Sequence, residues 1–553
     1  CHWHHARFDL CSGATLDPFA DDAVSYDVAI DEGRVLVSAS SPPFDLDVTL
    51  RRVEEGLEHG LTLVLAKAVL AMEAEGVEPE AVIGAGVRFG CRFRATGFGP
   101  GLTVLCAMAN VLEHLDEPDR ALALVHGLTF VSGDTRDRAP WFPLDPLGGA
   151  SAPPDRLAAW YRRFVETRSA DAAERVLSTA IASGMGTREL AEMTGAAATD
   201  HVFLDEGHVV DFTNKAFELV DRLSAEDPSA ASLVLPTLVH QTVRATRQEE
   251  EGPWRHPHDL ALLVSEAVER LDELVATTRW QPVGGDDARH FEADGGTGVL
   301  GWQLLDEDPV AVVGAIFDAV GRGASAEQLG RAVAYASALR ITRFHVQNDH
   351  GDWNVVHHGF TSASALHQLL VRAPSPLLVR GVFHAASKVF LDRFLNVPAA
   401  RLPSAHQLAA SAPLRAVGAA SAATSLDGLR ECWDGEGHVD DAGAIVYVYL
   451  HDGGSRHDVV AALGHALLVE DAGFHWFQLY EAAVRQAFAW PEGAEEGALI
   501  LAGAARFLAA HTPTRRELAQ VVRIARRLRR GEALYADDDA DADAGAERVT
   551  TRA

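Results

Sequence analysis

The stretch from 57 to 72, LEHGLTLVLAKAVLAM, decides the fold class of this chain. Its larger apolar residues include a series spaced three or four apart: Leu57, Leu61, Val64, Leu65, Val69 and Met72. Residues at this spacing share one face of an α-helix, so the stretch predicts a helix with a buried stripe. Similar Ala-rich patterns continue to about residue 530. We therefore expect a mainly α protein.

The segment before this helix has a period of two. Apolar residues alternate with polar ones on both sides of the turn signal Asp31-Glu32-Gly33: Val24, Tyr26, Val28 and Ile30, then Val35 and Val37. The alternation predicts a β-hairpin with one buried face. Ser40-Ser41-Pro42-Pro43 predicts a linker. We expect a small β unit over 1–40, an all-α domain over 44–533 and a disordered acidic tail over 534–553.

The helical region carries an internal pattern. Four helix starts are expected near 77, 187, 324 and 455, which are about 110–137 residues apart. Second helices then carry His208, His357 or His358, and His475, and third helices carry His126, His240, His384 and, in the last unit, Arg506. The pattern predicts four stacked helical units. The alternative is that Ala-rich helices simply resemble one another.

Histidines and carboxylates lie together on these otherwise apolar helices. His208 and Asp211 are one turn apart, and His475 precedes Glu481 by less than two turns. Imidazoles and carboxylates on facing helices can bind non-haem iron or act as acid–base pairs. We predict one shared polar pocket, with His208, Asp211, His357, His475 and Glu481 as its catalytic candidates. The alternative is a set of separate core histidines, each bonded to a nearby carboxylate or carbonyl.

Net charge, hydropathy and cysteine spacing limit the classes of function that the chain can have. The net charge of −31 argues against nucleic acid, which requires a basic face. No apolar run reaches membrane-spanning length without a charge or a helix breaker, so no membrane span is expected. Five Cys without regular spacing predict no disulfide framework. Neither a Gly-rich phosphate loop nor the paired Glu-x-x-His motif of ferritin-like di-iron proteins is present.

The first residues, Cys1-His2-Trp3-His4 followed by Ala6-Arg7-Phe8-Asp9-Leu10 and Gly13, form a recognisable motif. With the hairpin after it, this segment resembles the second half of a Rieske [2Fe–2S] domain, in which Cys-x-His precedes Cys-x-x-His. The resemblance covers about residues 1–40. It implies that Cys1 is a thiolate ligand and His4 an imidazole ligand of the cluster. The Cys-x-His half is absent, so we expect a fragment that holds only half of the ligands.

The resemblance leads to a functional hypothesis. We expect a Rieske-type oxidoreductase in which single electrons pass between a [2Fe–2S] cluster and a substrate or metal site in the helical domain, where additional non-haem iron would bind. Its partners would be an electron donor or acceptor protein and a small-molecule substrate, in the reducing cytoplasm. The alternative is an electron carrier whose helical region is a non-catalytic docking scaffold. The segment 357–366 is also similar to questin-oxidase-like proteins, but no residue role is carried over from them.

Overall fold

The computed structural model describes residues 6–10, 13–15, 20, 22–40, 44–94, 97–148, 152–277, 280–410 and 426–532. Helices make up 70% of the chain and strands 2%, which confirms the predicted mainly α fold. None of the described helices is long and apolar enough to cross a membrane.

The hairpin forms where the alternation predicts it. Strands β1 (Val28–Asp31) and β2 (Arg34–Val37) pair antiparallel, with Asp31 opposite Arg34. Glu32 and Gly33 form the two-residue turn with φ of 47° and 79°, the positive values that match the twist of a hairpin. An isolated antiparallel bridge also joins Phe8 to Thr15, on either side of Gly13.

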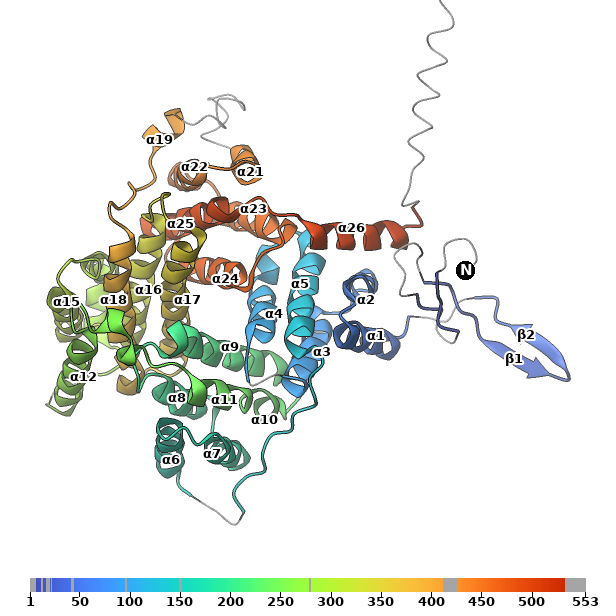
Figure 1. Ribbon diagram of the computed structural model, residues 1–553, viewed down its shortest axis with the longest axis horizontal. Helices are drawn as coiled ribbons and strands as arrows, with labels where there is room; N and C mark the ends of the chain where they lie inside the picture. Colours follow the sequence, from blue (N-terminus) through green and yellow to red (C-terminus); the bar gives the residue numbers. More distant parts are fainter. Residues whose placement is uncertain are drawn as a thin grey trace, which may run out of the picture.

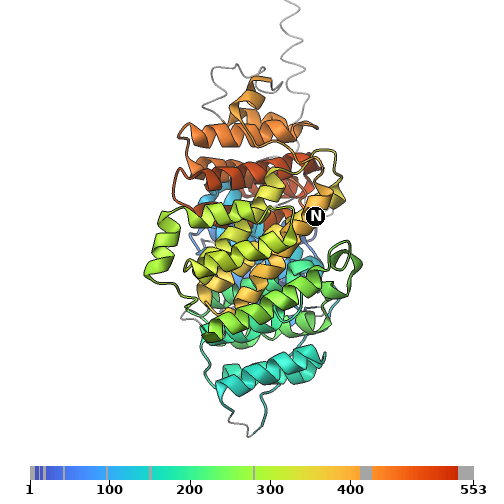
Figure 2. The ribbon, with the colours of Figure 1, turned by 90° about the vertical axis from the view of Figure 1, so that its left-hand side faces the viewer.

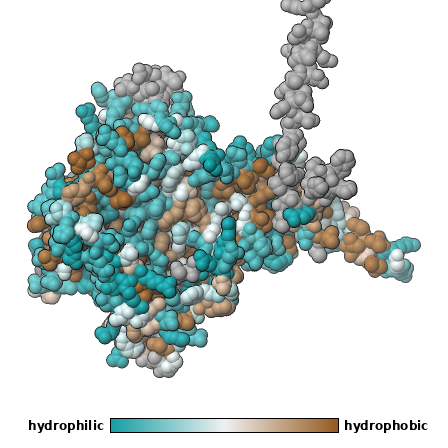
Figure 3. All heavy atoms as spheres, viewed as in Figure 1, coloured by the Kyte–Doolittle hydropathy of each residue, from teal (hydrophilic) through white to brown (hydrophobic). Residues whose placement is uncertain are grey.

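The expected buried face of this hairpin was wrong. Every residue of both strands is exposed, including Ile30 at 78% and Val35 at 66%. The hairpin projects away from the helices, so no described element covers either face (Figure 1). Its apolar side chains form the brown arm of the space-filling view (Figure 3).

The first helical stretch is two helices and not the single one expected. Helix α1 (Leu46–His59) ends at Gly60, which has a φ of 66° and donates its backbone N–H to Gly56 O. Helix α2 (Thr62–Ala74) then begins a new direction. Glycine adopts this left-handed conformation without the steric cost that a Cβ imposes, so Gly60 ends the helix although the apolar spacing continues.

The four expected helix starts are confirmed, at Pro79, Thr187, Ala326 and Arg456. The corresponding first helices are α3 (Pro79–Arg92), α8 (Thr187–Ala198), α16 (Ala326–Thr342) and α23 (Arg456–Val469). The second helices are α4 (Pro100–Val111), α9 (His208–Leu223), α17 (His350–Arg372) and α24 (Phe474–Phe488). The third helices are α5 (Glu117–Thr135), α11 (Thr237–Arg244), α18 (Pro376–Asp392) and α25 (Glu495–His511). That the units are true repeats stays a prediction.

Further helices pack around these units, and many of the helices lie side by side in layers (Figure 2). They are α6 (Pro154–Glu166), α7 (Ala170–Ala182), α10 (Ala230–Val234), α12 (Leu260–Thr277), α13 (Asp286–Ala293), α14 (Gly296–Gln303), α15 (Pro309–Gly321), α19 (Ala405–Ala410), α21 (Asp427–Asp434), α22 (Val439–His451) and α26 (Glu517–Arg529). Short 3₁₀ turns also occur, among them η2 (Leu204–Gly207).

The four second helices form a closed ring at the centre of the molecule. Helix α4 packs on α9, α9 on α17, α17 on α24, and α24 on α4. Small residues let neighbouring helices approach the ring closely. A Cβ at Gly330 of α16, for example, would lie 3.0 Å from His367 Cα of α17. Polar side chains that point into this ring are removed from water, so they must meet partners there.

Candidate metal centre

Three imidazoles meet inside the ring, each from a different second helix. His208 is the first residue of α9, His358 lies in α17, and His475 is the second residue of α24. One ring nitrogen from each lies within 4.8 Å of those of the other two. The Nε2 atoms of His358 and His475 are 3.2 Å apart.

The turn η2 positions His208 and the carboxylate of Glu206. Phe203, Asp205 and Glu206 all have positive φ, and Gly207 follows with a φ of 92°. A Cβ at Gly207 would lie 2.6 Å from Ser362 Cβ of α17, so only glycine allows this close approach. Left-handed conformations at non-glycine residues cost free energy and cluster at functional sites. Here the turn starts α9 at His208 and brings Glu206 over α17.

Glu206 orients His358. Its Oε2 lies 3.1 Å from His358 Nδ1, which donates the hydrogen bond. This bond lowers the pKa of Glu206 and makes His358 Nε2 an acceptor, which faces His475 Nε2 at hydrogen-bond distance. Carboxylates that bind the distal nitrogen in this way fix the tautomer and ring orientation of metal-binding histidines.

A fourth imidazole, that of His357, lies beside the three. It is fully buried, and its ring centroid is 4.5 Å from that of His475. Its Nδ1 donates to Asn354 O at 3.1 Å, whereas its Nε2 has no hydrogen-bond partner in the described part of the chain. Buried polar atoms without a partner are rare in folded proteins, so this nitrogen is available to a ligand.

Burial keeps His208, His475 and the neighbouring His357 neutral at pH 7. Burial, reinforced by the neighbouring imidazoles, lowers the pKa of His208 to about 3 and that of His475 to about 4. The same causes hold the pKa of His357 well below its usual value. A metal ion binds the neutral imidazole, so protons compete weakly for these rings at neutral pH.

One distance between ring nitrogens of the trio matches that of two ligands on one metal ion, and the largest does not. Bonds of about 2.0–2.1 Å from imidazole nitrogen to a metal place two ligand nitrogens about 2.9–3.4 Å apart. The 3.2 Å between His358 and His475 falls in this range. The spread of up to 4.8 Å within the trio exceeds it, so a ring must turn inward for all three to bind one ion.

Two hollows border the imidazole cluster, one at His208 and the other at His358. The first, of about 410 Å³, is lined by His208 together with Phe98, Phe212, Phe474 and Arg94. The second, of about 700 Å³, is lined by His358, Glu206, Phe203, Trp254 and Lys388. Concave, largely apolar sites with a few convergent polar groups are where small molecules bind. The cluster therefore has access on two sides.

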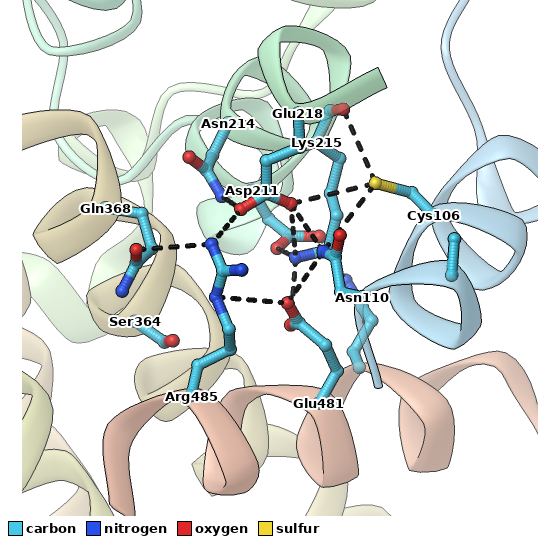
Figure 4. A network of polar contacts seen from close by, with 12 residues as sticks. Cys106, Asn110, Asp211, Asn214, Lys215, Glu218, Ser364, Gln368, Glu481 and Arg485 are labelled. Carbon is cyan, nitrogen blue, oxygen red and sulfur yellow. Dashed lines mark hydrogen bonds and ion pairs between the residues drawn. The ribbon is translucent and has the colours of Figure 1, made fainter. Parts of the chain in front are cut away.

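A separate charged network fills the next level of the ring (Figure 4). Lys215 Nζ lies 2.9 Å from Glu481 Oε2, 3.6 Å from Glu218 Oε2 and 3.8 Å from Asp211 Oδ1. Arg485 binds Glu218, and Asn110 donates to both Glu218 and Glu481. We call this group the Lys215 network.

Burial raises the pKa of Asp211 to about 6, although Lys215 opposes the shift. Burial alone would also raise the pKa of Glu218, but Lys215 and Arg485 outweigh it and the pKa falls. Burial would lower the pKa of Lys215, but the three carboxylates outweigh it and keep the ammonium charged. Charged groups thus compensate one another inside the ring.

The structure divides the predicted catalytic candidates between two places. His208, His357 and His475 come together, with His358 as the alternative that the sequence left open. Asp211 and Glu481 belong to the Lys215 network, and Asp211 accepts a hydrogen bond from Gln478, one turn after His475. No sequence pattern singled out Glu206, although it precedes Gly207 and His208 directly.

The third-helix histidines lie apart from the imidazole cluster. His126 Nε2 lies 2.9 Å from Leu468 O, and His240 Nε2 lies 3.5 Å from Glu174 Oε2. His384 is buried in α18. These residues belong to helices that are not part of the ring, so they serve separate environments, as the alternative interpretation had it.

Cys1 and His4 lie outside the described residues, and their role as cluster ligands stays a prediction. Comparisons with models of protein families, with curated proteins and with solved structures find no match to this chain.

Proposed function

We propose that this chain is an oxidoreductase whose helical domain holds a non-haem iron ion on His208, His358 and His475. The observation that carries the proposal is the meeting of three imidazoles from three ring helices, with ligand atoms within 4.8 Å. Imidazole sites also suit zinc, copper and nickel. The resemblance of the N-terminal segment to a Rieske domain favours a redox-active metal, and among these iron.

In this proposal the N-terminal segment supplies electrons. Cys1 and His4 would provide one thiolate and one imidazole to a [2Fe–2S] cluster, which when bound transfers single electrons. An electron donor or acceptor protein would exchange electrons with that cluster. The need for reduced thiols places the protein in the cytoplasm, again as a proposal.

The residues around the imidazoles have supporting roles. Glu206 holds His358 in the tautomer that presents Nε2. The buried side chains of the ring exclude bulk water, and the two hollows admit a small-molecule substrate to one side and a second reactant to the other. His357 offers a further nitrogen if the metal takes a fourth imidazole.

Metal analysis of the purified full chain tests this proposal. We expect one iron per chain at the histidine cluster, lost in His358→Ala and retained in His126→Gln, whose histidine is buried but outside the ring. Equal metal content in both variants, or no metal in the unaltered chain after anaerobic incubation with Fe(II), would support the docking-scaffold alternative instead.

A further inference from the structure

A buried guanidinium lines the hollow beside His208. Arg94 follows the end of α3 and is only 4% exposed. Its Nη1 donates to Cys91 O at 3.2 Å, but Nε and Nη2 have no hydrogen-bond partner within the described ranges. The ring of Trp141 lies 5.0 Å from Arg94 Cζ and gives partial compensation through its π face.

This positive charge is not neutralised by the acids near it. Among the described residues, no carboxylate oxygen lies within 4.0 Å of the guanidinium of Arg94. Glu174 acts on it only from a greater distance, and Glu174 Oε2 instead faces His240. Burial lowers the pKa of Arg94, but an arginine starts so high that it stays charged. A buried, unpaired charge is costly, so the arrangement calls for an anion.

The carboxylates of the same hollow are already occupied. Asp134 accepts a hydrogen bond from the backbone N–H of Gly101, and Asp205 accepts one from Gln241 Nε2. Burial raises the pKa of both carboxyls. Arg138 adds a second positive group at the exposed part of the lining. Arg94 is therefore the charged group of the hollow whose donors lack an acceptor within the described ranges.

Three phenylalanines form an apolar part of the lining. The ring of Phe98 lies 5.6 Å from that of Phe212, and Phe212 lies 6.4 Å from Phe474. His208 stacks on Phe212 with centroids 5.4 Å apart. This wall leads directly to a member of the imidazole cluster.

The hollow also occupies a distinct place in the ring. Three second helices bring histidines to the cluster, whereas the hollow is lined by the start of α4, at Gly99, Pro100 and Leu102. Helix α4 thus lines the hollow, whereas α9, α17 and α24 carry the three histidines of the cluster.

We propose that this hollow binds an organic carboxylic acid with an apolar body. The planar carboxylate pairs with the guanidinium fork of Arg94, and the body packs on Phe98, Phe212 and Phe474 beside His208. The identification of the acid as the substrate of the metal centre rests on the proposed function. The binding of the acid in the hollow is independent of that function.

Calorimetric titration of the metal-free full chain tests the binding. Benzoate and its neutral analogue benzamide serve as probes, since they share a ring and differ in charge. We expect benzoate to bind roughly tenfold to a hundredfold more tightly than benzamide, because hydrogen bonds to a charged partner are the stronger ones. Arg94→Met should abolish this preference, and Arg94→Lys should restore part of it. Arg92→Met, which removes an arginine stacked on Phe142 outside the hollow, should keep it.

Equal affinities for benzoate and benzamide in the unaltered chain would overturn the proposal, and this comparison holds even if Arg94→Met fails to fold. A preference that survives Arg94→Met in a folded protein would overturn it as well. Because the titration is done without metal, its failure leaves the histidine metal site untouched. Conversely, absence of metal binding does not alter the titration.

Discussion

The ring of second helices carries two buried polar groups about one turn apart, and they differ in how they are satisfied. In the Lys215 network, one ammonium meets three carboxylates, and Asn110 donates to two of them, so every charge has a countercharge. In the imidazole cluster, His357 Nε2 has no partner and the rings border two hollows. The same helices thus bear a closed group and an open one.

This difference separates structure from chemistry. A network in which every charge meets a countercharge specifies how the helices pack, and removing one member weakens the compensation of the others. A group of imidazoles at the wall of a pocket can offer ring nitrogens to a ligand. We therefore assign Asp211 and Glu481 to holding the ring together and the histidines to the proposed chemistry.

The largest expected effect comes from breaking the Lys215 network. Lys215→Met keeps much of the side-chain volume but leaves the buried Asp211 without a cation, and Glu218 and Glu481 with Arg485 alone. We expect the free energy of unfolding to fall by about 3–5 kcal/mol, measured by urea denaturation. Lys67→Met provides a control, since it also removes a buried lysine, but one outside the ring. A loss below about 1 kcal/mol for Lys215→Met would contradict the assignment.

Removing an imidazole should weaken iron binding more than it lowers the stability of the fold. His475→Ala should weaken iron binding by at least about a hundredfold, because the loss of a ligand exceeds that of an orienting group. Its cost in stability should be smaller than that of Lys215→Met, since no ion is left unpaired. Iron titration and urea denaturation on the same preparations compare the two. An unchanged iron affinity would remove His475 from the metal site.

Glu206→Gln should give an intermediate effect. The amide cannot hold His358 Nδ1–H as the carboxylate does, so we expect iron affinity to fall about tenfold to a hundredfold. Glu266→Gln, an exposed position on α12, is the matched control and should bind iron like the unaltered chain. Equal affinity in both variants would mean that Glu206 does not orient the ligand.

The last comparison concerns how the free energy of unfolding of the metal-free chain depends on pH. The His201 ring lies against Glu249 and Glu166, and although burial opposes it, these bonds raise its pKa. The stability from His201 is therefore full below pH 6.5 and is lost as pH rises through its folded pKa. His208 and His475 have lowered pKa values, so their contribution is present above pH 6.5 and is lost as pH falls toward 4 and 3.

Histidine NMR titration separates these two classes. The His201 signal should move at a pH above 6.5, and the signals of His208 and His475 should stay at their neutral positions until near pH 4. His201→Gln identifies the first signal. Titration of the cluster near pH 6.5 would show that its rings are hydrated and not buried.

Much of the fold was accessible from local patterns. Helix starts near 187 and 455 follow from glycine and capping residues that act within a few positions, and the hairpin turn at Glu32-Gly33 is equally local. The single helix expected over 57–72 failed because Gly60 outweighs an apolar spacing that continues past it. The buried face of the hairpin failed because burial depends on what packs against the strands.

The helical class, the helix starts and the presence of histidines on the second helices follow from the amino-acid sequence, since propensity and periodicity are properties of neighbouring residues. The closure of α4, α9, α17 and α24 into a ring became apparent only in three dimensions, because it joins residues more than a hundred positions apart. The ring placed His208, His358 and His475 within reach of one ion and left His126, His240 and His384 elsewhere. It also revealed Arg94 and Glu206, whose roles depend on the groups that face them in space.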